Sequence, residues 1–294
     1  MSPPRRGPSN LPASIHARLL RLAKESDANF NVVLVRFATE RLLYRLSRSP
    51  HADRFVLKGA WLFYVWDLDR RVTRDLDLLG FGDARPAAIE EVFRDVLASP
   101  VEPDGIEFDD AQLQVAEMRE GAAYPGVRVR VVARLGNARI PFQVDVGFGD
   151  AVLNPPPRTA LPTLLDLPAP ELDVYPVEAV VAEKVQAMVR LDVLNTRLKD
   201  YFDLYVLATE VTIDAASLAR QIAQTFQRRG TAIPAGEPAG LSDAFASEPE
   251  RNARWRAFLE RSGGAASAPA SFPEVVDRVR ELVLAPLEAV RRGG

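Results

Sequence analysis

No cysteine occurs in this 294-residue sequence, which excludes disulfide bonds, thiolate metal sites and a cysteine nucleophile. Only two histidines are present, so a histidine-rich zinc site is excluded as well. The sequence also lacks any uninterrupted apolar run long enough to span a membrane, and its polar, proline-rich beginning does not resemble a signal peptide. These absences predict a cytoplasmic protein without membrane contact, whose chemistry depends on carboxylates, Lys, Arg and hydroxyl groups.

The net charge of −3 gives no general attraction to nucleic acid, so any such binding requires a local basic patch. Basic residues are concentrated in the first fifty positions, although charged residues on helix faces are often simply solvated. The candidates are Arg18, Arg21, Lys24, Arg36, Arg41, Arg45 and Arg48.

Hydrophobic periodicity predicts helices over residues 12–24, 30–47, 60–66, 86–98, 177–191, 197–210, 214–228 and 272–291. Strands are predicted over 54–59 and 75–79, and a hairpin over 127–135 and 139–147 with its turn at Gly136-Asn137. The proline-rich residues 154–176 are interpreted as a linker or domain boundary. We therefore predict an α/β (α+β) chain with two lobes: a disordered tail (1–11), a first domain with a mixed sheet (12–165) and a helical C-terminal domain (166–294).

Two aspartates one residue apart, Asp75 and Asp77, are the strongest functional signal. Residues i and i+2 of a strand point to the same face, so both carboxylates are directed to one place. Two neighbouring anions need a positive partner, and hard oxygen ligands suit a divalent cation such as Mg²⁺ or Mn²⁺. The alternative is a solvated strand end. Thr73 shares the aspartate face if the strand begins early, and Arg71 and Arg74 could neutralise phosphate or bind acceptor RNA, or be plain surface residues.

A glycine at the end of a strand that opens a helix has the form of a phosphate-binding turn, and Lys58, Gly59 and Ala60 fit that position, although such a glycine alone is usually just a turn. Asp145, on the polar side of the second hairpin strand, supplies a third acid that could bind a second metal ion and help to deprotonate an attacking hydroxyl. Together these residues form a layout typical of nucleotidyl transfer.

Lys184 interrupts the apolar face of the helix at 177–191 and therefore needs an anionic partner. Asp200 and Asp203, three residues apart on the next helix, are candidates. We predict that Lys184 contacts substrate phosphates and that Asp203 orients it; alternatively, Lys184 extends to solvent and the aspartates only favour a helix start.

At this point the sequence resembles the AbiEii-type nucleotidyltransferase toxins, a family that includes the MenT toxins. The resemblance runs from about residue 12 to the C-terminus, through five segments in the same order: 55–60, 73–79, 143–150, 182–188 and 195–204. It implies a DNA polymerase β-like nucleotidyltransferase core with an added helical domain, and the toxin half of a toxin–antitoxin pair. It also implies Asp75 and Asp77 as metal ligands, and Lys184 and Asp203 as the motif residues of the C-terminal half. Ala60 departs from the serine that many nucleotidyltransferases place after the first glycine.

The resemblance further implies that the enzyme adds nucleotides from an NTP to the 3′ end of tRNA, which blocks aminoacylation and translation. The expected partners are thus an NTP, the tRNA acceptor end and a cognate antitoxin protein. Two alternatives are open: a nucleotidyltransferase acting on a small molecule or a protein hydroxyl, and a non-catalytic nucleotide-sensing module.

Overall fold

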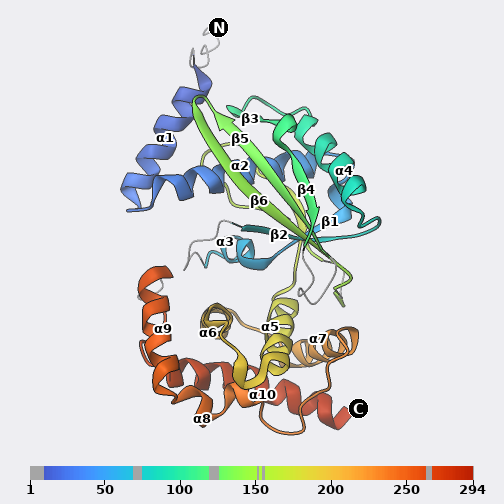
Figure 1. Cartoon of the computed structure of the whole chain (residues 1–294), viewed down its shortest axis with the longest axis vertical. Coiled ribbons are helices and arrows are strands. Elements are labelled where there is room, and N and C mark those ends of the chain that lie inside the picture. The colour runs from blue at the N-terminus through green and yellow to red at the C-terminus, as the bar shows by residue number, and fades with distance from the viewer. Residues whose placement is uncertain are drawn as a thin grey trace, which may run out of the picture. The chain divides into compact units, whose positions relative to one another are not determined.

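The computed structural model describes residues 10–68, 75–118, 126–150, 152–153, 156–262 and 267–293. The chain divides into two compact units, coloured by chain position in Figure 1. The first, here called the sheet unit, is built from the described residues within 1–65, 73–149 and 157–174. The second, the helical unit, contains those within 66–72, 150–156 and 175–294.

One mixed sheet forms the centre of the sheet unit. Its eight strands are β1 (Phe55–Lys58), β2 (Asp75–Gly80), β3 (Ile106–Phe108), β4 (Gln114–Glu117), β5 (Gly126–Leu135), β6 (Ala138–Phe148), β7 (Arg158–Ala160) and β8 (Glu171–Val174). The order is β3-β5-β6-β2-β1-β8-β7, and β4 also pairs with β5. β2 is parallel to β6 and antiparallel to β1, so the chain must leave the sheet and return between β2 and β6.

Three helices pack against this sheet: α1 (Leu11–Glu25), α2 (Phe30–Arg48) and α4 (Pro86–Ala98). The side chains of Asn10 and Asn29 accept hydrogen bonds from the first turns of α1 and α2, which explains where these helices begin. α4 has no side-chain cap and begins instead with a proline, whose fixed φ and missing N–H suit the first position of a helix. The predicted helix ranges were confirmed here.

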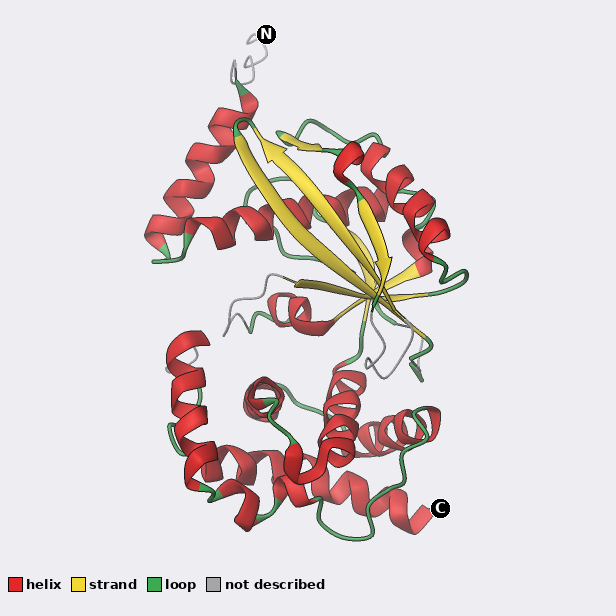
Figure 2. Cartoon of the chain, in the orientation of Figure 1, coloured by secondary structure: helices red, strands yellow, loops and turns green. Residues whose placement is uncertain are grey.

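The alternation of β6 separates the two faces of the sheet. Phe142, Val144 and Val146 are buried, whereas Gln143 and Asp145 between them are half-buried and point to the opposite face. In Figure 2, the long strands β5 and β6 lie beside the helical layer formed by α1 and α2. One face of the sheet therefore builds the core, and the other presents polar side chains.

The helical unit contains α5 (Val177–Leu191), α6 (Leu198–Glu210), α7 (Ala215–Arg228), α8 (Asp243–Ala246), α9 (Pro249–Ser262) and α10 (Phe272–Gly293). Its core is aromatic: Tyr201, Trp255 and Phe272 are fully buried, and the Phe272 ring lies 5.1 Å from that of Tyr201 and 5.4 Å from that of Trp255. None of the described helices combines the length and hydrophobicity that a bilayer crossing requires.

Two expectations need correction. The proline-rich residues 154–176, predicted as a linker or domain boundary, contain the strands β7 and β8, and β8 pairs with β1 beside the edge strand β7. The change from the sheet unit to the helical unit falls at the end of this region, between Val174 and Tyr175. The helix expected over 60–66 is instead a 3₁₀ turn at Gly59–Trp61 followed by a four-residue helix, α3 (Leu62–Val65). Its aromatic side chains Trp61, Phe63 and Tyr64 are buried, as expected for core residues. Residues 1–9 of the predicted tail lie outside the described residues, and α1 already begins at Leu11.

Candidate active site

A row of four charged residues crosses the polar face of the sheet. Strand pairing sets Lys58 opposite Asp77, Asp77 opposite Asp145, and Asp145 opposite Arg128. Residues directly opposite in neighbouring strands point to the same side, so these four side chains share one face. The two predicted acids from distant parts of the sequence are therefore adjacent, and each has a cationic residue on its outer side.

Asp77 is packed against Gly59. The backbone of Gly59 has φ +72°, and a Cβ atom added there would lie 2.1 Å from Asp77 Oδ2. Any side chain would thus collide with the carboxylate, and L-residues are also strained at this φ. The close approach explains the glycine after β1, which the sequence had suggested only as a phosphate-binding turn. α3 has only four residues and is too short to bind phosphate at its N-terminus. The predicted phosphate binding therefore depends on the backbone of the turn at Gly59–Trp61.

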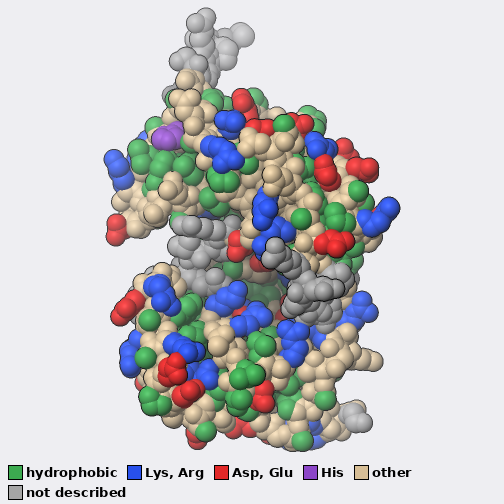
Figure 3. All heavy atoms as spheres, viewed as in Figure 1, with side chains coloured by type: hydrophobic (Ala, Val, Ile, Leu, Met, Phe, Trp, Pro, Cys, Tyr) green, Lys and Arg blue, Asp and Glu red, His purple; other side chains and the backbone are tan. Residues whose placement is uncertain are grey.

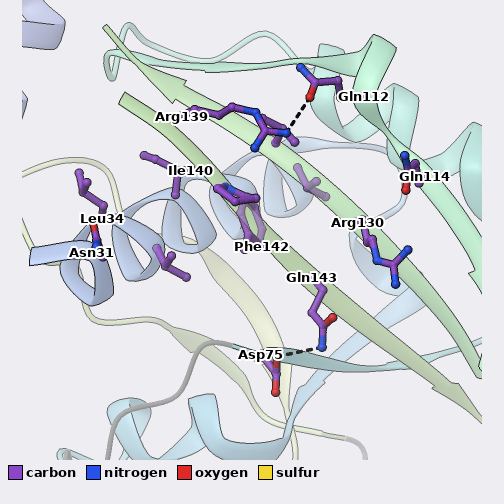
Figure 4. Close-up of a pocket in the computed structure, with 14 residues that line it drawn as sticks. Asn31, Leu34, Asp75, Gln112, Gln114, Arg130, Arg139, Ile140, Phe142 and Gln143 are labelled. Atoms are coloured by element: carbon purple, nitrogen blue, oxygen red, sulfur yellow. Dashed lines mark hydrogen bonds between the residues drawn. The ribbon is translucent and has the colours of Figure 1, made fainter. Parts of the chain in front are cut away.

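Asp75 is more exposed than Asp77 and is held from the neighbouring strand. Gln143 lies opposite Asp75, and its Nε2 donates a hydrogen bond of 2.9 Å to Asp75 Oδ1. An amide that holds one carboxylate oxygen leaves the other to accept from a different partner. Figure 4 shows this contact at the edge of a cavity.

Asp145 has a partner that the sequence analysis missed. Arg128 donates to both of its oxygens, from Nε to Oδ1 and from Nη2 to Oδ2, each at 2.7 Å. The hydrogen bonds to Asp145 raise the pKa of Arg128, and the nearby charges of Asp75 and Asp77 contribute in the same direction. The two-residue turn at Gly136-Asn137 fixes the register that brings Arg128 opposite Asp145, so the predicted hairpin contained the necessary signal.

The acids fit a divalent cation only in part. Asp75 and Asp77 offer hard carboxylate oxygens on one strand face, which suits Mg²⁺ or Mn²⁺. Within the described residues, however, no group of three or more acidic or histidine side chains could hold a metal ion. Arg128 donates to both oxygens of Asp145, so its guanidinium competes with a cation for this carboxylate.

Lys184 lies in the helical unit between two buried aspartates. Its Nζ donates to Asp200 Oδ1 at 2.9 Å and to Asp203 Oδ2 at 2.8 Å, and both aspartates are 1% exposed. Arg197 Nε approaches Asp200 Oδ2 at 2.6 Å, so two cations balance two anions. Burial alone would lower the pKa of Lys184, but the two carboxylates outweigh it and raise the pKa above its ordinary value. Lys184 thus has the anionic partners that its position required and remains a cation at neutral pH.

Several predicted nucleic-acid contacts need comment. Arg71, Thr73 and Arg74 lie outside the described residues. Among the N-terminal basic residues, Arg41 is fully buried against Glu40, and Arg45 is buried against Asp104 at 2.7 Å. These two arginines stabilise the sheet unit and are not available to RNA, which corrects the prediction. The partner of Arg41 is the buried Glu40 of the same helix, and the partner of Arg45 is Asp104, 59 residues further along the chain. The helical periodicity of α2 does not predict either pairing.

The structure is similar to three solved structures of low sequence identity. MenT4, the nucleotidyltransferase toxin Rv2826c from Mycobacterium tuberculosis H37Rv, is 20% identical with a TM-score of 0.49, over 95% of this chain and 98% of that chain. A putative nucleotidyltransferase from H. pylori is 13% identical (TM-score 0.45, 96% and 97% covered), and JHP933 from Helicobacter pylori is 12% identical (TM-score 0.43, 98% and 96% covered). These TM-scores are below 0.5, so the three likenesses carry no argument about activity.

Comparison at the sequence level is more informative. No curated protein matches the chain. The family described as "Nucleotidyl transferase AbiEii toxin, Type IV TA system" matches residues 41–278, which is most of the chain and includes every predicted acid as well as Lys184. The chain therefore belongs to the AbiEii family of nucleotidyltransferase toxins.

Proposed function

We propose that this protein is the toxin of a toxin–antitoxin system and transfers a nucleoside monophosphate from an NTP to the 3′ end of tRNA, which would block aminoacylation and translation. The observation that carries the proposal is the pairing of β2 with β6. It places Asp145 of β6 directly opposite Asp77 of β2, and Asp75 lies two residues before Asp77 on the same strand. Membership of the AbiEii family supports the transferase chemistry and the existence of an antitoxin partner.

Asp75 and Asp77 would hold Mg²⁺ or Mn²⁺, with Asp145 as a further ligand once Arg128 has moved away. A divalent ion bound there supplies Lewis-acid polarisation of the α-phosphate and charge neutralisation for the leaving pyrophosphate. Backbone N–H groups at Gly59 and Ala60, together with the Lys58 ammonium, are proposed to hold the triphosphate, and Thr73 is proposed to assist them.

The proposed reaction joins the acceptor hydroxyl oxygen to the α-phosphorus and breaks the bond between the α-phosphorus and the bridging oxygen to the β-phosphate. Pyrophosphate leaves, and Asp145 is the proposed acceptor of the hydroxyl proton. Arg128, released from Asp145, becomes a free guanidinium on the same sheet face that can neutralise phosphate charge.

Lys184 and Asp203 are proposed to act in substrate binding as well. An ammonium group has three N–H donors, and Asp200 and Asp203 use two of them. The third donor could therefore take a phosphate oxygen while Asp203 holds the side chain in place. Arg71 and Arg74 are proposed to contact the RNA backbone.

The proposal is tested by incubating the full chain with Mg²⁺, each labelled NTP, total RNA and total cellular protein. We expect label on tRNA, lost in the isosteric variant Asp77→Asn. The matched control is Asp53→Asn, because the Asp53 side chain is 91% exposed at the surface of the same unit. Label on protein would assign a different acceptor, absence of label on any acceptor would refute the transferase, and full activity of Asp77→Asn would refute the metal site.

A further inference from the structure

The free edge of β4 lies at the end of the charged row on the sheet. Figure 1 shows β4 beside β5, its only partner strand, and no strand of the described residues covers its other edge. Ala116 is directly opposite Arg128, so the row that starts at Lys58 ends at this small, exposed side chain. Open strand edges pair readily with another chain, and proteins often protect them with lysine or proline. β4 contains neither residue.

The main chain of β4 offers hydrogen-bonding groups at this edge. Met118 N–H donates to the carbonyl oxygen of Gly126 at 2.8 Å, so the main-chain groups of Met118 face β5. These groups alternate along an antiparallel strand, so those of Val115 and Glu117 point outward, away from β5. Within the described part of the chain, no other main-chain group pairs with them. An extended peptide can add a strand through such groups.

A groove of about 730 Å³ runs along β4 and onto β5, and we call it the β4 groove. It is lined by Gln114, Val115, Ala116, Glu117, Met118, Arg128 and Arg130.

The β4 groove is cationic on the polar face of the sheet. Arg130 is exposed and has no ion-pair or hydrogen-bond partner among the described residues, and Figure 4 shows its guanidinium apart from Gln143 and Asp75. Arg128 is shared with Asp145. In the space-filling view, Lys and Arg side chains lie over β5 and β6 (Figure 3). The lining favours an anionic occupant on this face.

A strand added to β4 would place every second side chain on the face of Arg128. The residue opposite Ala116 would lie two strand spacings from Arg128, about 10 Å between the main chains. Ala116 has only a methyl group and leaves the path between them open. An extended acidic side chain and the arginine side chain can meet across this distance. The added carboxylate would then compete with Asp145 for the guanidinium.

These features favour a protein segment as the occupant. RNA phosphates would contact the arginines but would not pair with the outward N–H and C=O groups of the edge. A second copy of β4 in a symmetric antiparallel pair would bring Gln114 and Ala116 to the arginine face. Its one acid, Glu117, would lie on the opposite face. A second copy therefore provides no carboxylate for the arginines.

We propose that the free edge of β4 docks an extended segment of a partner protein, and that an acidic residue of this segment, opposite Ala116, draws Arg128 away from Asp145. The docking itself goes beyond the proposed function, whereas its effect on the acids rests on that function. With Arg128 held by the partner, Asp145 is left to the cation of Asp75 and Asp77. Partner binding thus raises the cation affinity of the site.

The probe is a capped octapeptide of alternating Val and Thr, in which Glu replaces one central Thr, and its twin carries Gln there. Calorimetry with the full chain should show the Glu peptide binding about tenfold more tightly than its twin, a difference that Arg128→Gln abolishes. Glu117→Pro removes an outward N–H without breaking the ladder to β5 and should weaken both peptides about tenfold. Glu117→Ala keeps the N–H and should bind as the wild type does. Amide hydrogen exchange of β5 peptides checks that both variants keep the sheet.

Mn²⁺ binding is then followed by electron paramagnetic resonance with saturating peptide. The Glu peptide should tighten Mn²⁺ binding by the wild type about tenfold, its twin should have no effect, and neither should affect Arg128→Gln.

The inference is overturned if the twins bind equally, if Glu117→Pro binds like Glu117→Ala, or if the bound Glu peptide leaves Mn²⁺ affinity unchanged. It is also overturned if single-stranded RNA displaces the peptide at a lower concentration than the peptide itself requires, or if the free chain self-associates in sedimentation and Glu117→Pro abolishes this. Expected peptide binding without label transfer from any NTP would refute the proposed function and support the docking surface. Label transfer by a protein that does not distinguish the peptides would do the reverse.

Discussion

Replacing Gly59 with alanine tests how rigidly the fold holds Asp77. The new Cβ atom would lie 2.1 Å from Asp77 Oδ2 and 2.7 Å from Asp77 Cβ and Cγ, so the carboxylate and its strand must move. The positive φ of +72° adds about 1–2 kcal/mol of backbone strain, and overpacking of this kind adds about 1–3 kcal/mol. We therefore expect Gly59→Ala to lower the free energy of unfolding of the sheet unit by about 2–5 kcal/mol.

Two other glycines of the same unit separate these contributions. Gly136 also has a positive φ, +58°, but the nearest atom to its added Cβ is 3.7 Å away, so Gly136→Ala should cost only the strain, about 1 kcal/mol. Gly147 has no positive φ and nothing within 4 Å, so Gly147→Ala should be neutral or stabilise by about 0.5 kcal/mol through the unfolded chain.

The assay is urea-dependent amide hydrogen exchange of peptides from β5 and β6, which reports the sheet unit by itself. Nucleotide transfer measured in parallel should fall by about a hundredfold in Gly59→Ala, because a displacement of about 1 Å at a reacting centre has that effect. If Gly59→Ala destabilises no more than Gly136→Ala, Asp77 is not fixed against Gly59 and the reasoning is refuted.

Two further predictions concern the ion pairs of the two units. Arg128→Gln should bind Mn²⁺ on the order of tenfold more tightly by electron paramagnetic resonance, because a unit charge pair at 4 Å is worth about 1 kcal/mol even in water and the variant no longer repels the ion. Arg134→Gln, on the same strand as Arg128, removes only the pair with Asp109 and should not change Mn²⁺ binding. Equal affinity in the wild type and both variants would contradict the competition between Arg128 and metal. Lys184→Met should destabilise the helical unit by about 3–5 kcal/mol, because the buried Asp200 and Asp203 both lose their ammonium partner. The loss is measured by amide hydrogen exchange of peptides from α5 and α6 in urea. Adding Asp203→Asn should recover part of it, and no recovery would argue against charge burial as the cause. The pKa of Lys184 in the folded state is raised above its ordinary 10.5. The stabilisation by its charge is therefore fully present below about pH 10.5 and is lost as the pH rises through the folded-state pKa. The difference in unfolding free energy between wild type and Lys184→Met should accordingly be constant from about pH 7 to 9 and shrink only above about 10.5.

Local signals in the sequence were sufficient for most of the long elements, but not for the 14-residue α9, in which only Trp255 and Leu259 are buried. Helices such as α4 and α5 have clear apolar periodicity, and the hairpin of β5 and β6 has both alternation and a two-residue turn. The short strands β3, β4, β7 and β8 were missed because three or four residues do not establish a period, and β7 and β8 lie among prolines that suggest a linker.

The acids of the candidate site could be predicted because Asp75, Asp77 and Asp145 lie on strands with readable alternation. Arg128 was not predicted, although the register of the hairpin places it directly opposite Asp145. Arg45 was misjudged for the opposite reason: its partner Asp104 is 59 residues away, and no local pattern reveals a pairing over that distance.

The pairing of β2 with β6 also determines when the protein can become active. Gln143 and Asp75 are 68 residues apart, and Asp145 and Asp77 meet through the same strand pair. A chain still emerging from the ribosome therefore has no assembled acid cluster until residues beyond Asp145 have been synthesised and β6 has docked. Such long-range pairing is slow compared with helix formation. A truncated or partly folded molecule accordingly lacks the assembled acid cluster, and the complete chain acquires it only when β6 docks on β2.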